Sequence, residues 1–288
     1  MKKIIAIVLA VALTLSAAVM LASCGKEAEQ KTFTIAIPND TTNEGRALLL
    51  LQANGLIKLK EEAGITASVL DIAENPYNIE FKEAEAAQLP NILQDVDYAV
   101  INSNYAIAAG INPMERAIIM EGSDSAYSNI IAVKEGNENT DKIKALVAAC
   151  ESQAVADFIS ETYKGSVVST VDNPGDGYDS TVDYAALAGT KITVAASPSP
   201  HCEILEIVED ILEAKDIDLE VIEYTDYVVP NKVVESGEVD ANYFQHAPYL
   251  DDFNAENGTH IVSAAAIHVE PMGAYSNTYT SIADIING

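Results

Sequence analysis

Positive charge is scarce in this chain. Among its 288 residues, 16 are Lys or Arg and 44 are Asp or Glu, which gives a formal net charge of −28. Proteins that bind nucleic acid neutralise phosphates with basic patches, so we expect no nucleic-acid partner. An acidic surface instead favours solubility outside a membrane and repulsion from anionic headgroups.

Cysteine is also rare. The chain contains Cys24, Cys150 and Cys202, and so few cysteines do not make a disulfide framework. Cys150 and Cys202 could pair in an oxidising compartment or remain free thiols, and the sequence leaves both alternatives open. Cys202 follows His201, but no third group that would orient a catalytic pair is evident, which argues against a thiol nucleophile.

Sequence patterns of cofactor and catalytic sites are missing as well. The four histidines are scattered, and neither Cys-x-x-Cys nor His-Glu-x-x-His occurs, so no metal site is indicated. The chain has no Walker loop, no glycine-rich dinucleotide turn and no Ser/His/Asp set in a recognisable context. We therefore expect no metal, no cofactor, no catalytic residue and no enzymatic activity.

The N-terminal segment predicts export and membrane attachment. Lys2 and Lys3 precede an apolar run that ends in small residues, which is typical of a signal peptide over residues 1–23. The stretch "LASC" resembles the bacterial lipobox, so Cys24 would carry the lipid and 24–32 would form a polar tether. The alternatives are an ordinary signal with a chance cysteine, or an uncleaved anchor. A lipid holds a protein on a membrane without spanning it, here on the extracytoplasmic face of the cell membrane.

Short β-rich runs alternate with longer helical patterns, which predicts an α/β fold with a mostly parallel sheet. One strand-turn-helix unit occurs twice, as "FTIAIPND" with "TNEGRALLLLQANG" and as "KITVAASPSP" with "HCEILEIVEDILEAKD". A second similarity relates 95–110 to 237–253. Two such lobes facing each other would form a cleft at the ends of their strands, where open α/β sheets bind ligands. Generic α/β repetition is the alternative.

Local signals mark two boundaries within this pattern. Thr41 and Glu44 have the spacing of a capping box at the start of the first helix, and Asn54 with Gly55 supplies its stop. Between the two halves, 166–189 contains "DNPGDGYDST", which has no apolar period. This composition predicts a surface linker.

Arg46 is a candidate anion-binding residue. It is one of only two arginines and lies near the expected start of a helix. The planar guanidinium can grip a carboxylate with two hydrogen bonds, and a helix N-terminus adds N–H donors and a favourable dipole. The alternative is a surface arginine that pairs with Glu44 or another acid.

Amides and aromatics complete the set of candidate ligand-binding residues. Asn102 ends an expected strand and Asn129 lies in another, and each amide can donate and accept hydrogen bonds. Turn or cap roles are the alternative for both. Aromatic side chains suit a pocket for an apolar or sulfur-containing group, although they could equally be ordinary core residues. The aromatic candidates are Tyr227, Phe244, His246 and Tyr249.

At these residues the chain resembles the methionine-binding lipoproteins of the NlpA family, which are the solute receptors of methionine ABC transporters. The motifs that carry the resemblance are "AIPNDTTNEGRALLLLQANGLIKLK", "ENPYNIEFKEAEAAQLP", "VINSNYA", "SPSPHCEILE", "DYVVPNKVVESGEVDANYFQHAPYLDDFN" and "HVEPMGAYS". The resemblance implies an α/β, two-lobed periplasmic-binding-protein fold (type II-like). Relatives usually begin with the portion that is 190–288 here, so this chain looks circularly permuted, with 166–189 joining the family's ordinary ends.

The resemblance also implies lobe boundaries and residue roles. One lobe would be 33–126 plus 276–288, and the other 128–275. Arg46 would bind the ligand's carboxylate, and Asn102 and Asn129 its amino and carboxylate groups. The aromatic candidates would surround its side chain.

The expected function is therefore that of a monomeric, lipid-anchored receptor that captures methionine. It would deliver the methionine to an ABC permease and its ATPase. The alternatives keep the fold but bind another amino acid, D-methionine or a methionine-containing dipeptide, or serve as a sensor or surface protein.

Overall fold

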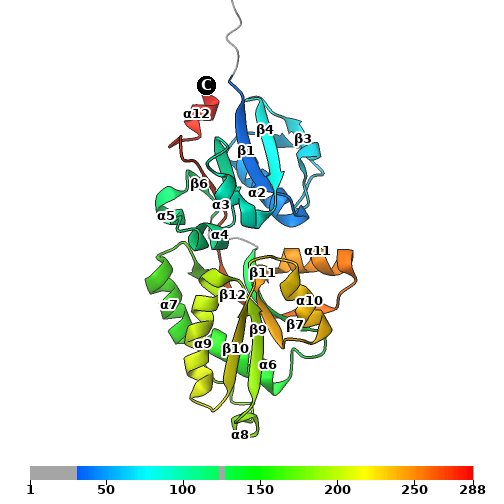
Figure 1. The fold of residues 1–288 in the computed structure, drawn as a ribbon, viewed down its shortest axis with the longest axis vertical. Helices are drawn as coiled ribbons and strands as arrows, with labels where there is room; N and C mark the ends of the chain where they lie inside the picture. Colours follow the sequence, from blue (N-terminus) through cyan, green and yellow to red (C-terminus); the bar gives the residue numbers. More distant parts are fainter. Residues whose placement is uncertain (1–30, 123–126, 288) are drawn as a thin grey trace, which may run out of the picture.

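A computed structural model describes residues 31–122 and 127–287. The expected signal peptide, Cys24 and most of the tether lie outside the described residues. Within the described ranges, no helix is both long and apolar enough to cross a membrane. The described chain folds into two lobes, one above the other in Figure 1.

The first lobe is built on a five-stranded sheet with the order β4-β1-β5-β13-β6. Strands β4 and β5 both run parallel to β1, whereas β13 is antiparallel to both β5 and β6. Its strands are β1 (Phe33–Pro38), β4 (Ile79–Ala84), β5 (Tyr98–Ile101), β6 (Ile119–Met120) and β13 (Gly273–Tyr275), with a separate pair β2 (Lys58–Leu59) and β3 (Ile72–Glu74). Its helices are α2 (Thr41–Ala53), η1 (Val69–Asp71), η2 (Ala86–Gln88), α3 (Leu89–Ile92), α4 (Ser103–Ala108), α5 (Pro113–Arg116) and α12 (Ala283–Ile286).

The second lobe is built on a six-stranded sheet with the order β10-β9-β11-β7-β12-β8. Strands β10 and β11 run parallel to β9, and β7 is antiparallel to β11. Its strands are β7 (Ser128–Lys134), β8 (Val168–Ser169), β9 (Lys191–Ala196), β10 (Asp218–Glu223), β11 (Ala241–His246) and β12 (Ile261–Val269). Its helices are α6 (Asp141–Cys150), α7 (Gln153–Tyr163), α8 (Tyr184–Leu187), η3 (Pro198–Cys202), α9 (Glu203–Glu213), α10 (Val229–Ser236) and α11 (Ala247–Asn257).

The same strand order occurs in both lobes. In each sheet, three parallel strands lie side by side, and the strand that comes first in the chain lies between the second and the third (β4-β1-β5 and β10-β9-β11). One antiparallel strand, β13 or β7, pairs with the third. Parallel neighbours require crossover connections, and helices of each lobe lie in these connections. The expected α/β class with two similar lobes is therefore confirmed.

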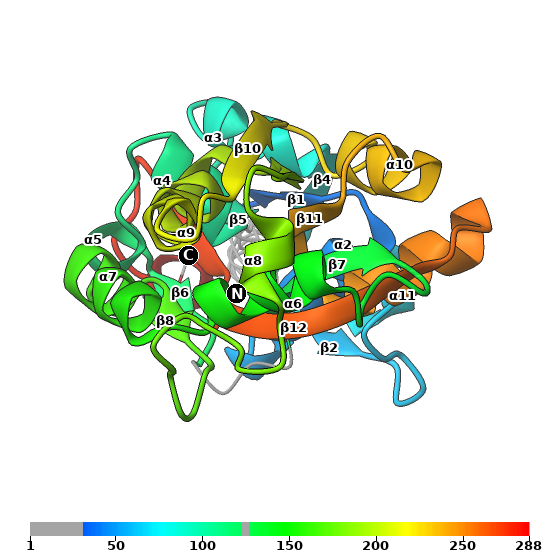
Figure 2. The ribbon, with the colours of Figure 1, turned by 90° about the horizontal axis from the view of Figure 1, so that it is seen from below.

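Successive side chains of a strand point to opposite faces of its sheet. Both faces of each sheet are covered by buried apolar clusters. In β7, Ile131 and Val133 face a core with α6, α7 and α9, whereas Ile130 and Ala132 face α10 and α11. Figure 2 shows the second lobe end-on, with α7 and α9 on one side and α10 and α11 on the other. In β1, Ile35 likewise faces the core formed with α2.

The chain passes between the lobes twice. The first passage lies between Met120 at the end of β6 and Ser128 at the start of β7. The second lies between Val269 at the end of β12 and Gly273 at the start of β13. Because β13 pairs with β5 and β6, residues 273–275 belong to the first sheet. The expected boundary at 275 was therefore placed a few residues too late.

The C-terminal segment packs against the beginning of β1, in the lobe to which the resemblance assigns 276–288. The ring of Tyr279 stacks on Tyr98 with 5.2 Å between ring centroids and meets Phe33 edge-on at 5.7 Å. The Tyr98 hydroxyl donates to the carbonyl of Ser281 at 3.0 Å. The two ends of the described chain therefore pack against one cluster.

The segment 166–189 is more ordered than a simple linker. Its strand β8 pairs with β12, Gly175 forms a bridge with Ser152, and Val182 is buried. Val182 is an apolar residue within a polar stretch, which accounts for its burial. Most of the other side chains between Val171 and Thr190 are exposed or half-buried.

Candidate functional site

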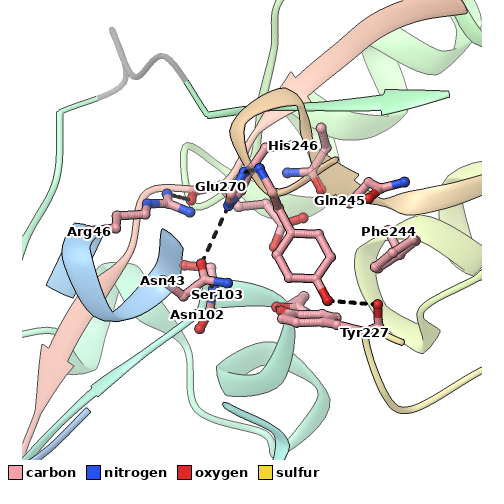
Figure 3. Close-up of a pocket in the computed structure, with 12 residues that line it drawn as sticks. Asn43, Arg46, Asn102, Ser103, Tyr227, Phe244, Gln245, His246 and Glu270 are labelled. Atoms are coloured by element: carbon pink, nitrogen blue, oxygen red, sulfur yellow. Dashed lines mark hydrogen bonds between the residues drawn. The ribbon is translucent and has the colours of Figure 1, made fainter. Parts of the chain in front are cut away.

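A polar cavity with one aromatic wall lies where the lobes meet. Seven lining residues are those singled out from the sequence: Arg46, Asn102, Asn129, Tyr227, Phe244, His246 and Tyr249. Five more complete the lining, namely Asn43, Ser103, Asn104, Gln245 and Glu270. Figure 3 shows Arg46, Asn43 and Asn102 on one side of the cavity and Phe244 opposite them. Residues from both halves of the sequence therefore converge on one site.

Helix α2 carries Arg46 into the cavity. Asp40 is the N-cap residue, because its side chain accepts a hydrogen bond from the Asn43 backbone N–H at 3.1 Å. The expected capping box of Thr41 and Glu44 is wrong, since Asp40 precedes the helix and offers a better-placed acceptor. Glu44 instead accepts from the backbone N–H of Val69 at 2.8 Å, so the alternative pairing of Arg46 with Glu44 is not found.

Arg46 is buried, and its guanidinium is already paired. Its Nε donates to Glu121 Oε1 at 2.9 Å, and its Nη2 donates to Glu121 Oε2 at 2.6 Å and to the Glu270 carbonyl at 2.8 Å. The guanidinium also lies 4.3 Å from the ring centroid of Tyr127. Within the described residues these hydrogen bonds engage Nε and Nη2, and none is found for Nη1. The sequence allowed for pairing with an acid other than Glu44, and that acid is Glu121, whereas the binding of an anion by Arg46 stays a prediction.

A hydrogen-bonded pair of amides lies beside Arg46. Asn102 Nδ2 donates to Asn43 Oδ1 at 2.8 Å, so the orientation of the Asn102 amide follows from its partner. The other end of that amide, Oδ1, is buried and has no hydrogen-bond partner among the described residues. The amide of Asn102 therefore has an acceptor to spare in a cavity-lining position.

His246 connects this amide pair to the second lobe. Its Nδ1 accepts from the backbone N–H of Tyr249 at 3.2 Å, so the neutral ring carries its proton on Nε2. That N–H points to Asn43 Oδ1 at 3.4 Å, the dashed line in Figure 3. Burial, together with the charge of Arg46, holds the pKa of His246 well below its usual value. His246 is therefore a neutral donor.

A buried polar chain ends on Glu270, which lines the cavity. The Tyr243 hydroxyl hydrogen-bonds to His268 Nδ1, and His268 Nε2 lies 2.8 Å from Glu270 Oε1. Burial raises the pKa of Tyr243 well above its usual value and lowers the pKa of His268 to about 3. The hydroxyl therefore donates to Nδ1, and the neutral imidazole donates from Nε2 to the carboxylate.

His201 joins the same carboxylate to Asn129. Its Nε2 lies 3.3 Å from Glu270 Oε1 and 2.9 Å from Asn129 Oδ1. Burial lowers the pKa of His201 to about 3, so the ring is neutral and Nε2 carries the proton toward both oxygens. The Nδ2 of Asn129 is thus left as the donor of that amide.

His201, His268 and Glu270 form a cluster that could hold a metal ion. Their potential ligand atoms lie within 4.8 Å of one another, and all three side chains are buried. No spacing in the sequence points to this cluster, because His201 in η3 is far along the chain from His268 in β12 and from Glu270 just after it. Hydrogen bonds from two neutral imidazoles to one carboxylate account for the same geometry.

The aromatic wall is held by contacts across the lobes. The Tyr227 hydroxyl donates to Asn104 Oδ1 at 2.7 Å, and the Tyr249 hydroxyl donates to the Tyr227 carbonyl at 2.9 Å. The Tyr227 ring packs against Phe244 at 5.7 Å and against Tyr105 at 4.9 Å between centroids. Aromatic surfaces of this kind suit an apolar or thioether side chain.

The two cysteines within the described residues are free thiols. Cys150 is buried, and burial raises the pKa of Cys202 to about 12. A thiol with so high a pKa stays protonated at neutral pH and is a poor nucleophile. His201 faces Glu270 and Asn129, which also argues against a catalytic pair of His201 with Cys202.

These lobes and the cavity between them define a two-lobed α/β binding-protein fold. The chain belongs to the NlpA lipoprotein family, whose profile matches residues 27–171 and 192–288. The resemblance found from the sequence motifs is thereby confirmed.

Individual relatives match part of the chain. It is 43% identical over 136 residues to the D-methionine-binding lipoprotein MetQ of Escherichia coli O157:H7, covering 46% of this chain and 50% of the relative. It is 42% identical over 135 residues to the membrane lipoprotein TpN32 of Treponema pallidum, covering 47% and 50%. A nutrient-binding protein from Burkholderia cenocepacia, solved bound to methionine, shares 49% identity over 50% of this chain and 61% of its own, with a TM-score of 0.47. The chain thus spans about half the length of the curated relatives that it matches.

Proposed function

We propose that this protein binds methionine reversibly in the cavity between its lobes. The observation that carries the proposal is the composition of that cavity. Arg46 Nη1, Asn129 Nδ2 and the free acceptor of Asn102 suit the charged ends of an amino acid, and the aromatic wall suits its thioether side chain. Relatives in the same family, which include D-methionine-binding lipoproteins, support the same ligand.

Ligand-dependent thermal stability tests this proposal. A ligand that binds only the folded state stabilises it by about 2.7 kcal/mol at 100 times its Kd. We expect L- or D-methionine to raise the melting temperature by several degrees, with smaller shifts from leucine, glutamine and methionine-containing dipeptides. A panel in which neither enantiomer shifts the melting temperature, while another amino acid or a dipeptide does, would contradict methionine as the ligand.

The cellular role that we propose is capture of methionine at the extracytoplasmic face of the membrane and delivery to an ABC permease with its ATPase. Family membership supports a lipid-anchored binding protein without enzymatic activity. Transport in vesicles that contain a cognate permease and ATPase tests this role. If the protein binds methionine but never stimulates uptake by such a transporter, a sensor or surface role is favoured instead.

We also propose that the order of the chain is circularly permuted relative to the family. The family match is interrupted between residues 171 and 192, and each curated relative aligns over about half of its length. The two ends of the described chain pack against one cluster through Phe33, Tyr98 and Tyr279. Rejoining neighbouring ends costs little, because loop-closure entropy grows slowly with length.

A rearranged chain tests the permutation. We expect 190–287, followed by a short Gly/Ser linker and then 31–189, to fold with a melting temperature within a few degrees of the original and with the same ligand affinity. A second rearranged chain, opened inside β7 between Ile131 and Ala132, is the control and should not fold, because this break divides a buried strand. If both rearranged chains fail to fold, the permutation proposal is wrong.

A further inference from the structure

The charges at the cavity do not balance. Arg46 contributes one positive charge, and the carboxylate of Glu121 already pairs with it at 2.6 Å. Glu270 adds a second carboxylate in the cavity lining. The three buried histidines His201, His246 and His268 are neutral, because burial lowers each of their pKa values. Among the described residues at the site, one negative charge is therefore left without a counter-ion.

That negative charge is located on Glu270. Its carboxylate accepts from His268 Nε2 at 2.8 Å and lies 3.3 Å from His201 Nε2. These donors are neutral, so they solvate the charge without cancelling it. Burial raises the pKa of Glu270, as expected for a carboxylate that lacks a paired cation. Placing a cation beside it would stabilise both groups.

A second acceptor lines the same cavity. Asn102 is buried, and its Oδ1 has no partner among the described residues. Because Asn102 Nδ2 is held by Asn43 Oδ1 at 2.8 Å, the free atom is the carbonyl oxygen, which can only accept. Buried acceptors without a donor are rare in folded proteins. A ligand with several N–H donors would satisfy Asn102 while neutralising Glu270.

We propose that Glu270 is the counter-ion of a primary ammonium group on the ligand, with Asn102 Oδ1 as a second acceptor. The proposal rests on the proposed function and deepens it, since it makes the ammonium end, rather than the carboxylate end, the main electrostatic contact. The carboxylate end meets Arg46, which is already neutralised by Glu121, and the amide donor of Asn129. The site therefore selects primary amines with an apolar side chain.

The donors around Glu270 make this contact directional. His268, oriented by Tyr243, and His201 both point to Oε1 of the carboxylate. Glu270 is held between the two lobes, because both histidines belong to the second lobe and its carbonyl accepts from Arg46 of the first. A fixed acceptor loses less conformational entropy when the ligand binds.

Three ligands test the proposal on the full chain by calorimetry. Methionine has both charges, methioninamide keeps the ammonium group without the carboxylate, and 4-(methylthio)butanoate keeps the carboxylate without the ammonium group. We expect loss of the ammonium group to weaken binding by about 100-fold or more, and loss of the carboxylate by about 10-fold or less. The reverse order, or equal losses, would overturn the proposal. If methionine itself does not bind, the proposed function fails instead.

The variant Glu270→Gln separates an electrostatic role from a structural one. We expect methionine and methioninamide to bind about 100-fold more weakly to it, while the affinity for 4-(methylthio)butanoate stays the same or rises. Equal weakening of all three ligands would show that Glu270 only maintains the fold, and would refute the proposal. Glu220→Gln, which changes an exposed carboxylate far from the cavity lining, is the matched control and should leave all three affinities unchanged.

Discussion

Replacing Arg46 with alanine should weaken methionine binding by about 10-fold and lower the free energy of unfolding by about 3–5 kcal/mol, the range for removing one partner of a buried ion pair. The reason is that Glu121 would lose its counter-ion while remaining largely buried. Glu121 also accepts from the Met272 backbone N–H at 2.8 Å, and Arg46 donates to the Glu270 carbonyl. Arg46 thus ties helix α2 to both passages between the lobes, so its loss affects the fold as well as the ligand.

Urea unfolding and calorimetry on three variants separate these two roles. The double variant Arg46→Ala with Glu121→Gln no longer buries an unpaired carboxylate. It should therefore regain most of the lost stability without regaining binding. Arg116→Ala removes the other arginine, which is exposed and bonded to Asn277, and serves as the control. If Arg46→Ala keeps both its stability and its affinity, the buried pair is unimportant and the site is assigned wrongly.

The substitution Gly45→Ala should destabilise the first lobe by about 3 kcal/mol, at the upper end of the cost of overpacking. A Cβ atom at this position would lie 2.2 Å from the Ile65 carbonyl oxygen and 3.0 Å from the Ala67 backbone nitrogen. Both neighbours are backbone atoms, which cannot rotate away as a side chain end can. Helix α2 would have to move outward and carry Arg46 with it, so ligand affinity should fall together with stability.

Thermal unfolding and ligand titration of the same variant measure both effects. Gly64→Ala is the matched control in the neighbouring loop, because no heavy atom lies within 4 Å of a Cβ built there. A glycine-to-alanine change that causes no strain is neutral or slightly stabilising, since it restricts the unfolded chain. Equal melting temperatures for the two variants would mean that the close approach of α2 to residues 65–67 is not required.

Much of the fold could be predicted from local patterns. The two strand-turn-helix units correspond to β1 with α2 and to β9 with η3 and α9, and the helix stop at Asn54 and Gly55 is found where the sequence placed it. Such features depend on hydrophobic periodicity and on capping residues, which act over a few neighbouring positions. Six of the seven predicted cavity residues could be named because they lie in the family motifs, and Asn129 followed from the resemblance outside those motifs.

Other features could not be predicted, because they depend on groups that are distant in the chain. Arg46 and Glu121 are 75 positions apart, and in a sequence with 44 acidic residues nothing distinguishes Glu121 as the partner. Glu270 and His268 lie in the same family motif, "HVEPMGAYS", but the second histidine, His201, comes from η3, far earlier in the chain. The lobe boundary was misplaced because β13 is short and its pairing with β5 is non-local.

The sequence by itself determined the α/β class, the duplicated lobes, the family and the identity of the cavity-lining arginine, amides and aromatics, because periodicity and motifs depend on neighbouring residues. Only the tertiary structure decided the balance of charge at the site. Coulomb interactions and desolvation depend on distances and burial in space, so only the folded chain shows that Arg46 is already paired while Glu270 is not.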